Sequence, residues 1–192
     1  PILLNYLDAN SLGFWYIFAT IAELLMLLDF GFQSTVMRNT TYVLSGANKI
    51  MREGLSDIPQ IGQVKLDLLN SLIKASRKFY LIISLIGIVI GIILVIPYLI
   101  IILEKNNTGT ATSSIIIAWL VFLSGCLLDL FFGYQNAILS GVGRIKESNK
   151  SLTLSRLVYL VLSSILLYLG FGLIGLGISK LVSAITHRCI NL

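Results

Sequence analysis

Five ionisable residues lie inside stretches of sequence that are otherwise apolar. Three are acids, Glu23, Asp29 and Asp129, and two are bases, Arg156 and Lys180. Ionisable groups within a bilayer are costly and usually face a cavity or a partner, so each is a candidate functional residue. The competing interpretation is structural: each group forms an ion pair or a hydrogen bond that fixes the packing of two helices.

Asp129 has small and polar neighbours on its own helical face. Gly125, Gly133 and Asn136 lie at helical spacing from it. A stripe of this kind faces protein or water, since lipid favours larger apolar side chains. We therefore expect either an ion- or proton-responsive carboxylate in a polar cavity or a hydrogen bond between helices.

Glu23 and Asp29 lie in the first apolar stretch, and Gln33 follows Asp29 by one turn. At about 100° per helical residue the two acids point about 120° apart, so we expect them not to line a single surface. For both acids, the lining of a cavity and structural pairing are the two open interpretations.

The two bases differ in depth. Lys180 shares a helical face with Ser183 and His187 and lies too deep in its span to snorkel easily. It is predicted either to contact an anion inside a cavity or to pair with Asp29 or Asp129. Arg156 lies in the first cytoplasmic turn of its helix, where snorkelling to lipid headgroups competes with a cavity role.

The composition places these residues in a membrane protein. Hydrophobic residues make up 56% of the 192 residues and charged residues 12%, against roughly 45–50% and about 25% in soluble domains. This composition excludes a water-soluble enzyme. Apolar stretches long enough for a hydrocarbon core of about 30 Å predict five transmembrane helices. The predicted spans cover residues 12–36, 80–103, 114–139, 152–169 and 173 to the end of the chain.

Small residues and one proline mark special points in these spans. Gly87 and Gly91 form a small-xxx-small pattern that lets a neighbouring helix approach closely. Pro97 is expected to bend the far end of the second span. The glycine-rich stretch 170–177 predicts a tight turn followed by a close-packed helix start.

Lysine and arginine predict the orientation. Seven lie in the connection 38–78, three in 140–151 and one in the tail, against one, Lys105, on the opposite side. The two connections and the C-terminal end are therefore predicted to be cytoplasmic, and residues 1–11, 104–113 and 170–172 to face outward. Within the cytoplasmic segment 45–78, apolar residues from Ile61 to Leu72 recur at helical spacing, which predicts an amphipathic helix on the inner membrane face.

Enzymatic motifs are scarce. His187, the single histidine, lies near a span end, which favours an interfacial position over a ligand role. Cys126 and Cys189 have no metal-ligand spacing, and no strand precedes the Gly141-Val-Gly143 stretch, which predicts a loop turn. We predict a protein that is not an enzyme, holds no metal or cofactor and has no nucleic-acid partner.

Three stretches resemble bacterial polysaccharide transporters. They are Gly13-Phe-Trp-Tyr, the run 28–39 and the run 132–150. These transporters are the O-antigen flippases and capsule exporters of the superfamily that also holds the multidrug and toxin extruders. The resemblance implies a bundle of the type found in those extruders, with the five spans corresponding to helices two to six of a 12–14-helix transporter. We accordingly expect the chain to be part of a longer protein and expect no transport from this half-bundle alone.

The resemblance also implies a cargo and a mechanism. Members of the family flip undecaprenyl-diphosphate-linked oligosaccharides across the bacterial cytoplasmic membrane by alternating access. Lys180, Arg156 and Arg38 would then be the cations for the diphosphate, with Arg38 at the inner mouth. Asp129 and Asp29, with Glu23, would be the acids that couple transport to protons or sodium, and Asn136 and Gln33 would be polar groups of the cavity. Membrane lipids and polysaccharide-assembly proteins would be further partners.

Other functions remain open from the residues. A drug or cation antiporter of the same superfamily would need acids to dominate its cavity, and the three acids and two bases here do not decide this. A membrane-embedded glycan enzyme would need a larger outward loop than 104–113. A non-transporting membrane scaffold is the remaining alternative.

Overall fold

The chain is an all-helical polytopic membrane protein. The computed structural model describes residues 5–47, 49, 65–106 and 112–190, and every regular element within those ranges is a helix. Within these ranges five helical segments are long and apolar enough to cross a membrane, as the sequence predicts. These segments are Ala9–Leu44, Leu66–Lys105, Thr112–Gly141, Ile145–Tyr168 and Gly172–Ile190.

The first segment is broken in two. Helix α2 (Ala9–Met26) continues as the 3-10 turn η1 (Leu27–Asp29), and α3 (Phe32–Leu44) follows. Between them Phe30 and Gly31 have φ of 46° and 72°, in the left-handed region that ends a helix. The span predicted over 12–36 lies within this segment, but the sequence did not predict the break at Phe30 and Gly31 or the continuation of helix to Leu44.

The second segment is interrupted directly before Pro97, where the sequence predicts a bend. Helix α4 (Leu66–Val89) passes through a π turn, η2 (Ile90–Leu94), into α5 (Val95–Asn106). Pro97 lacks the N–H that would bond to residue 93 and its ring crowds that turn, so the wider π turn directly before it relieves the conflict.

The predicted amphipathic helix is part of α4. Leu72 and Ser76 of α4 are buried, whereas Lys74 and Lys78 are exposed, and α4 packs against α3, α6 and α7. Because α4 is unbroken from Leu66 to Val89, this part continues the axis of the span and is not a separate helix along the membrane surface. The prediction for residues 61–64 lies outside the described residues.

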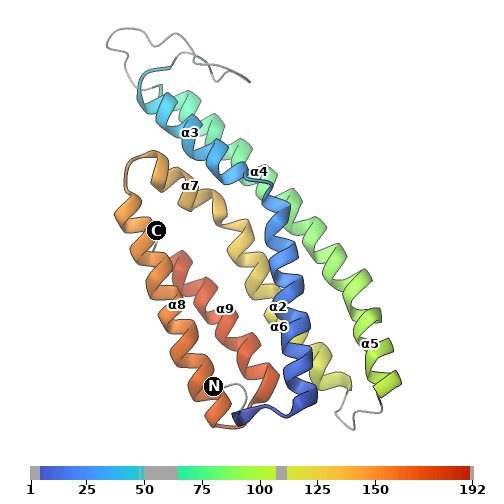
Figure 1. The fold of residues 1–192 in the computed structure, drawn as a ribbon. Helices are drawn as coiled ribbons and strands as arrows, with labels where there is room; N and C mark the ends of the chain where they lie inside the picture. Colours follow the sequence, from blue (N-terminus) through green and yellow to red (C-terminus); the bar gives the residue numbers. More distant parts are fainter. Residues whose placement is uncertain (1–4, 48, 50–64, 107–111, 191–192) are drawn as a thin grey trace.

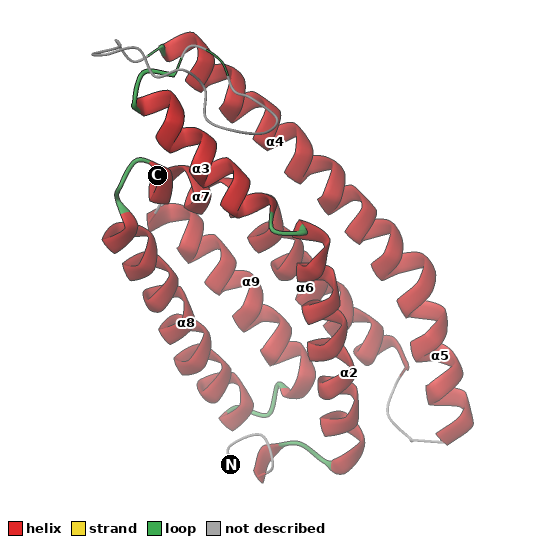
Figure 2. Cartoon of the chain, turned by 45° about the horizontal axis from the view of Figure 1, so that its top comes forward, coloured by secondary structure: helices red, strands yellow, loops and turns green. Residues whose placement is uncertain are grey.

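The remaining three segments form the closely packed part of the bundle. Helices α6 (Thr112–Phe131) and α7 (Gly133–Gly141) form the third segment, and α8 (Ile145–Tyr168) and α9 (Gly172–Ile190) the fourth and fifth. The predicted turn after Leu169 is confirmed, because Gly170 and Gly172 both have positive φ. Helix α9 lies along α6 and α8, while α2 and α4 pack on α6 (Figure 1, Figure 2).

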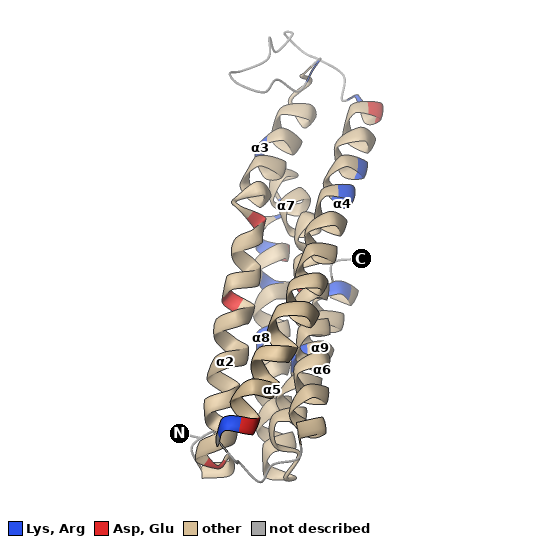
Figure 3. Cartoon of the chain, turned by 90° about the vertical axis from the view of Figure 1, so that its right-hand side faces the viewer, with Lys and Arg blue, Asp and Glu red and all other residues tan. Residues whose placement is uncertain are grey.

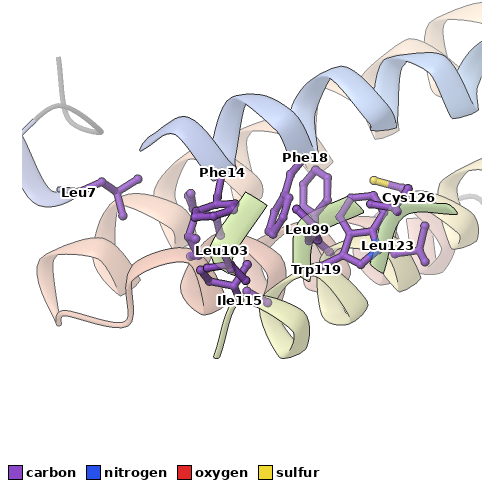
Figure 4. Packing of buried hydrophobic residues seen from close by; sticks show 14 of the residues in the cluster. Leu7, Phe14, Phe18, Leu99, Leu103, Ile115, Trp119, Leu123 and Cys126 are labelled. Carbon is purple, nitrogen blue, oxygen red and sulfur yellow. The ribbon is translucent and has the colours of Figure 1, made fainter. Parts of the chain in front are cut away.

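Aromatic and aliphatic side chains fill the space between α2, α5 and α6. Phe14 and Phe18 of α2 meet Leu99 of α5 and Trp119 of α6 (Figure 4). The Trp119 Nε1–H donates to the Gly91 carbonyl at 2.9 Å. A Cβ at Gly91 would lie 2.5 Å from the Leu123 side chain, so the predicted close approach at the Gly87/Gly91 pattern is confirmed.

Charged residues gather at one end of the bundle. The starts of α4 and α8 and the end of α3 lie at the same end, and several basic residues lie in the N-terminal halves of α4 and α8 (Figure 1). Figure 3 shows basic residues on the first half of α4, followed by a long uncharged stretch into α5. The cytoplasmic assignment of this end stays a prediction.

Candidate functional site

A cavity of about 620 Å³ lies among the helices, in the size range of small-ligand sites. Its wall combines apolar side chains with an unusual number of polar and ionisable ones. The ionisable or amide side chains in the wall are Glu23, Asp29, Gln33, Tyr80, Cys126, Asp129, Asn136, Arg156, Tyr159, Lys180 and His187. Seven of the eight predicted site residues therefore meet in one place.

The cavity is a cleft between α2 and α8. Helix α2 packs on α6 and α9, and α8 packs along α9, but α2 and α8 scarcely touch each other. Figure 1 shows α9 in the gap between them. Near the ends of these helices the rings of Tyr6 and Tyr168 meet edge to face, with centroids 6.1 Å apart. Helices α6 and α9 thus form the floor of the cleft, and α2 and α8 form its sides.

The floor carries an ion pair. The Lys180 ammonium on α9 donates a hydrogen bond to Oδ2 of Asp129 on α6. The two side chains keep only 23% and 21% of their surface exposed. Of the two interpretations for Lys180, an ion pair with an acid is confirmed, and Asp129 is the partner.

Gly125 makes this ion pair possible. A Cβ at Gly125 would lie 2.8 Å from the Leu181 nitrogen and 2.9 Å from the Lys180 carbonyl carbon, so the α9 backbone runs directly against it. Asp129 comes one turn after Gly125 on the same face. The small residue on the stripe therefore brings the Lys180 side chain, in the middle of α9, within reach of the Asp129 carboxylate.

His187 and Asn136 extend the ion pair into a network. His187 Nδ1 lies 3.8 Å from Asp129 Oδ1, and its Nε2 lies 3.2 Å from Asn136 Nδ2. His187 is buried. The sequence did not predict this burial of His187 among the helices, whereas its predicted place near the end of a span agrees with the end of α9 at Ile190. Its helical face, shared with Lys180 and Ser183, is the sequence signal that identifies it as part of the site.

Asp29 ties the broken end of α2 to its neighbours. Tyr80 Oη on α4 donates to Asp29 Oδ1 at 2.6 Å, and the Gln33 backbone N–H in the first turn of α3 donates to Oδ2 at 3.4 Å. A negative charge is favourable at a helix N-terminus. Asp29 therefore lines the cavity and also holds the helix break in place, so both interpretations apply to it.

Glu23 and Asp29 line the same cavity, which corrects the prediction that they do not share a surface. The reason is local geometry. The η1 turn covers Leu27–Asp29, and a 3-10 helix advances about 120° per residue rather than 100°. Over the three residues of η1 the extra rotation reduces the angle between the Glu23 and Asp29 side chains from about 120° to about 60°, so that both can face one cleft.

Glu23 and Arg156 stand on opposite sides of the cleft, on α2 and α8. Both are exposed, and neither forms a hydrogen bond or an ion pair with another residue in the described ranges. Arg156 therefore lines the cavity, although the sequence favoured snorkelling to lipid headgroups for this residue. Arg38 is exposed on α3 and is not part of the wall, so its proposed contact at the inner mouth stays a prediction.

The arrangement suits an amphiphilic ligand whose polar part lies in the cleft and whose apolar part stays outside it. Acids, bases and amides line a cleft whose helices expose large apolar side chains on their other sides, including Leu160 and Val161 on α8. In the described residues no group of three or more histidine, cysteine or carboxylate side chains could hold a metal ion. The chain matches no protein-family model, no curated protein and no solved structure.

Proposed function

We propose that the chain forms a bundle of a transporter that moves undecaprenyl-diphosphate-linked oligosaccharide units across the bacterial cytoplasmic membrane. The charged cleft between α2 and α8 is the observation that carries the proposal. A diphosphate and its sugars cannot enter hydrocarbon without replacement of their hydration, so the carrier must supply cations and hydrogen-bonding groups. The wall of the cleft supplies Lys180 and Arg156 as cations and Asn136 and Gln33 as amides.

The open side of the cleft fits the lipid part of this cargo. A polyprenyl chain stays in the hydrocarbon while its head group enters the protein, so the binding site must open sideways. Helices α2 and α8 flank such an opening because they scarcely contact each other.

The breaks in the helices provide places to bend. Alternating access needs segments that rock around a fixed binding site, and discontinuous helices commonly line such sites. The break at Phe30 and Gly31 and the junction at Phe132 both lie next to residues of the cavity wall. Motion there would change the opening of the cleft while the α6–α9 contact stays closed.

The test is binding of a fluorescent undecaprenyl-diphosphate oligosaccharide to the chain in lipid nanodiscs. Each charged hydrogen bond to phosphate contributes about 1.5–3 kcal/mol, so Arg156→Gln and Lys180→Gln should each weaken binding by about 10- to 150-fold. Lys78→Gln removes the same charge at an exposed position of α4 outside the cavity and is the matched control. Equal losses in all three variants, or none, would contradict the proposal.

A drug or cation antiporter is the second candidate, and one observation favours it. The charges of Lys180 and Asp129 compensate each other in their ion pair. The remaining charged groups of the cavity wall are two acids, Glu23 and Asp29, and one base, Arg156. This surplus of acids would attract a cation. In the same nanodiscs, ethidium binding that Glu23→Gln weakens and Arg156→Gln strengthens would support the antiporter and count against the flippase.

A further inference from the structure

His187 occupies the centre of the network on the cavity floor. One ring nitrogen faces the Asp129 carboxylate and the other faces the Asn136 amide, while Lys180 holds the second carboxylate oxygen. With a neutral imidazole this cluster carries one negative and one positive charge and is neutral overall. A histidine in such a position decides the charge of the whole cluster, because histidine commonly changes charge between about pH 5 and 8.

The neighbours define where a proton can bind. Asn136 Nδ2 lies 3.2 Å from His187 Nε2; in the Nδ1–H tautomer of the neutral ring, Nε2 accepts from this amide and Nδ1–H faces Asp129. In that tautomer a second proton enters at Nε2. The Asn136 amide then has to turn its carbonyl oxygen toward the ring, which couples the protonation of His187 to the orientation of a second cavity side chain.

We propose that His187 makes the floor of this cleft an anion site that takes up one proton together with its ligand. The inference rests on the proposed function, of which it describes the ion coupling. When Nε2 gains a proton, the cluster of Asp129, Lys180 and His187 changes from neutral to a net charge of +1. An oxyanion in the cavity restores neutrality, and Lys180, which lines the cavity, is its direct contact.

Charged and titratable groups on the surrounding elements bear on this change. From α2 and η1 come Glu23 and Asp29, from α4 Tyr80, and from α8 Arg156 and Tyr159, all in the same cavity wall. Tyr80 bonds to Asp29, so these two face each other rather than the imidazole. On α9 itself, the Arg188 guanidinium lies 4.6 Å from the centre of the Phe132 ring and is not part of the cavity wall. Asp129 is the acid that directly faces the ring.

Anion binding and the protonation of His187 must strengthen each other equally, and both effects can be measured. If the anion binds the protonated form better, the anion must also make His187 easier to protonate by the same factor. The affinity for an anion should then rise by up to about tenfold for each pH unit as the pH falls through the titration of His187. The sulfate ion is a suitable probe because its own charge does not change over this range.

The experiment uses the full chain in lipid nanodiscs with ¹⁵N-labelled histidine. The chain contains one histidine, so every ring signal belongs to His187. We expect the Nδ1–H tautomer at pH 8, sulfate binding about tenfold tighter at pH 6 than at pH 8, and a titration midpoint that saturating sulfate raises by about one pH unit. In His187→Gln, sulfate affinity should no longer depend on pH, whereas the control Arg188→Gln should keep the dependence.

Each other result has a definite meaning. Sulfate binding that needs Lys180 but does not depend on pH overturns the proton uptake and leaves the proposed function standing. A pH dependence that survives in His187→Gln also overturns it. The absence of sulfate binding at pH 6, with Lys180→Gln and Asp129→Asn behaving as the wild type, overturns the anion site and the proposed function together. If His187→Gln does not fold, the effect of sulfate on the wild-type histidine titration decides alone.

Discussion

Replacement of Gly125 by alanine tests whether the contact between α6 and α9 builds the site. The added Cβ would lie 2.8 Å from the Leu181 nitrogen and 3.0 Å from its Cα. Both atoms belong to the backbone, so no side chain can rotate away. Optimal separations of such atoms are about 3.5–4.0 Å, and the two helices must therefore part by at least about 0.7 Å.

The expected cost follows from that separation. Overpacking of a close contact costs about 1–3 kcal/mol, while alanine gains up to about 1 kcal/mol over glycine in helix propensity. Gly13→Ala on α2 provides the matched control, because its Cβ would meet nothing within 4 Å. The two variants carry the same gain in propensity. The difference between their free energies of unfolding should therefore report the packing cost alone, about 1–3 kcal/mol.

The assay is reversible unfolding in mixed lipid–detergent micelles, followed by helical circular dichroism. The ¹⁵N signals of His187 provide a second readout, because separation of α6 from α9 pulls Asp129 away from Lys180 and disturbs the imidazole beside them. Equal stability of Gly125→Ala and Gly13→Ala, with unchanged His187 signals, would refute the account of how the ion pair is assembled.

Three further changes test other parts of the structure in the same unfolding assay. Tyr80→Phe removes the hydrogen bond to Asp29 from a side chain that is 1% exposed and should cost about 1–3 kcal/mol, and a cost near zero would show that Asp29 does not hold the helix break. Phe30→Gly should stabilise the chain by about 1 kcal/mol, because Phe30 has a positive φ and is 87% exposed; destabilisation would mean that the phenyl ring has a packing role. Trp119→Phe should cost about 1–3 kcal/mol through the loss of the bond to the buried Gly91 carbonyl, and a neutral result would contradict that bond.

The sequence predicted what depends on hydrophobicity and on local residue types. Apolar length located all five spans, the Gly87/Gly91 pattern correctly marked a close contact, and Pro97 marked the place where a π turn interrupts the helix. The break at Phe30 and Gly31 was missed because a phenylalanine rarely adopts positive φ and the apolar pattern continues through it. Tertiary contacts, including the bond from Tyr80 to Asp29, hold the chain in that conformation.

The sequence predicted most of the residues of the candidate site but not which of them contact one another. The cost of charges in a bilayer identified Asp129, Lys180 and Arg156, and all three line the cavity. The pairing of Lys180 with Asp129 rather than Asp29 depends on the register between α6 and α9, which Gly125 sets across more than fifty residues of chain. His187 was placed at an interface because it lies near the end of its span, although it shares a helical face with Lys180.

The central claim is that the cleft between α2 and α8 holds the polar head of a lipid-linked oligosaccharide. Tyr159 and Leu160 are neighbours on α8, but Tyr159 lines the cavity, whereas Leu160 is 58% exposed and lies outside its wall. A photoreactive benzoylphenylalanine at each position, with the chain in nanodiscs that contain undecaprenyl-diphosphate oligosaccharide, measures the claim directly. We predict a crosslink to the head group from position 159, and from position 160 only crosslinks to bulk lipid. Equal capture of the head group at both positions, or capture at 160 alone, would contradict the account.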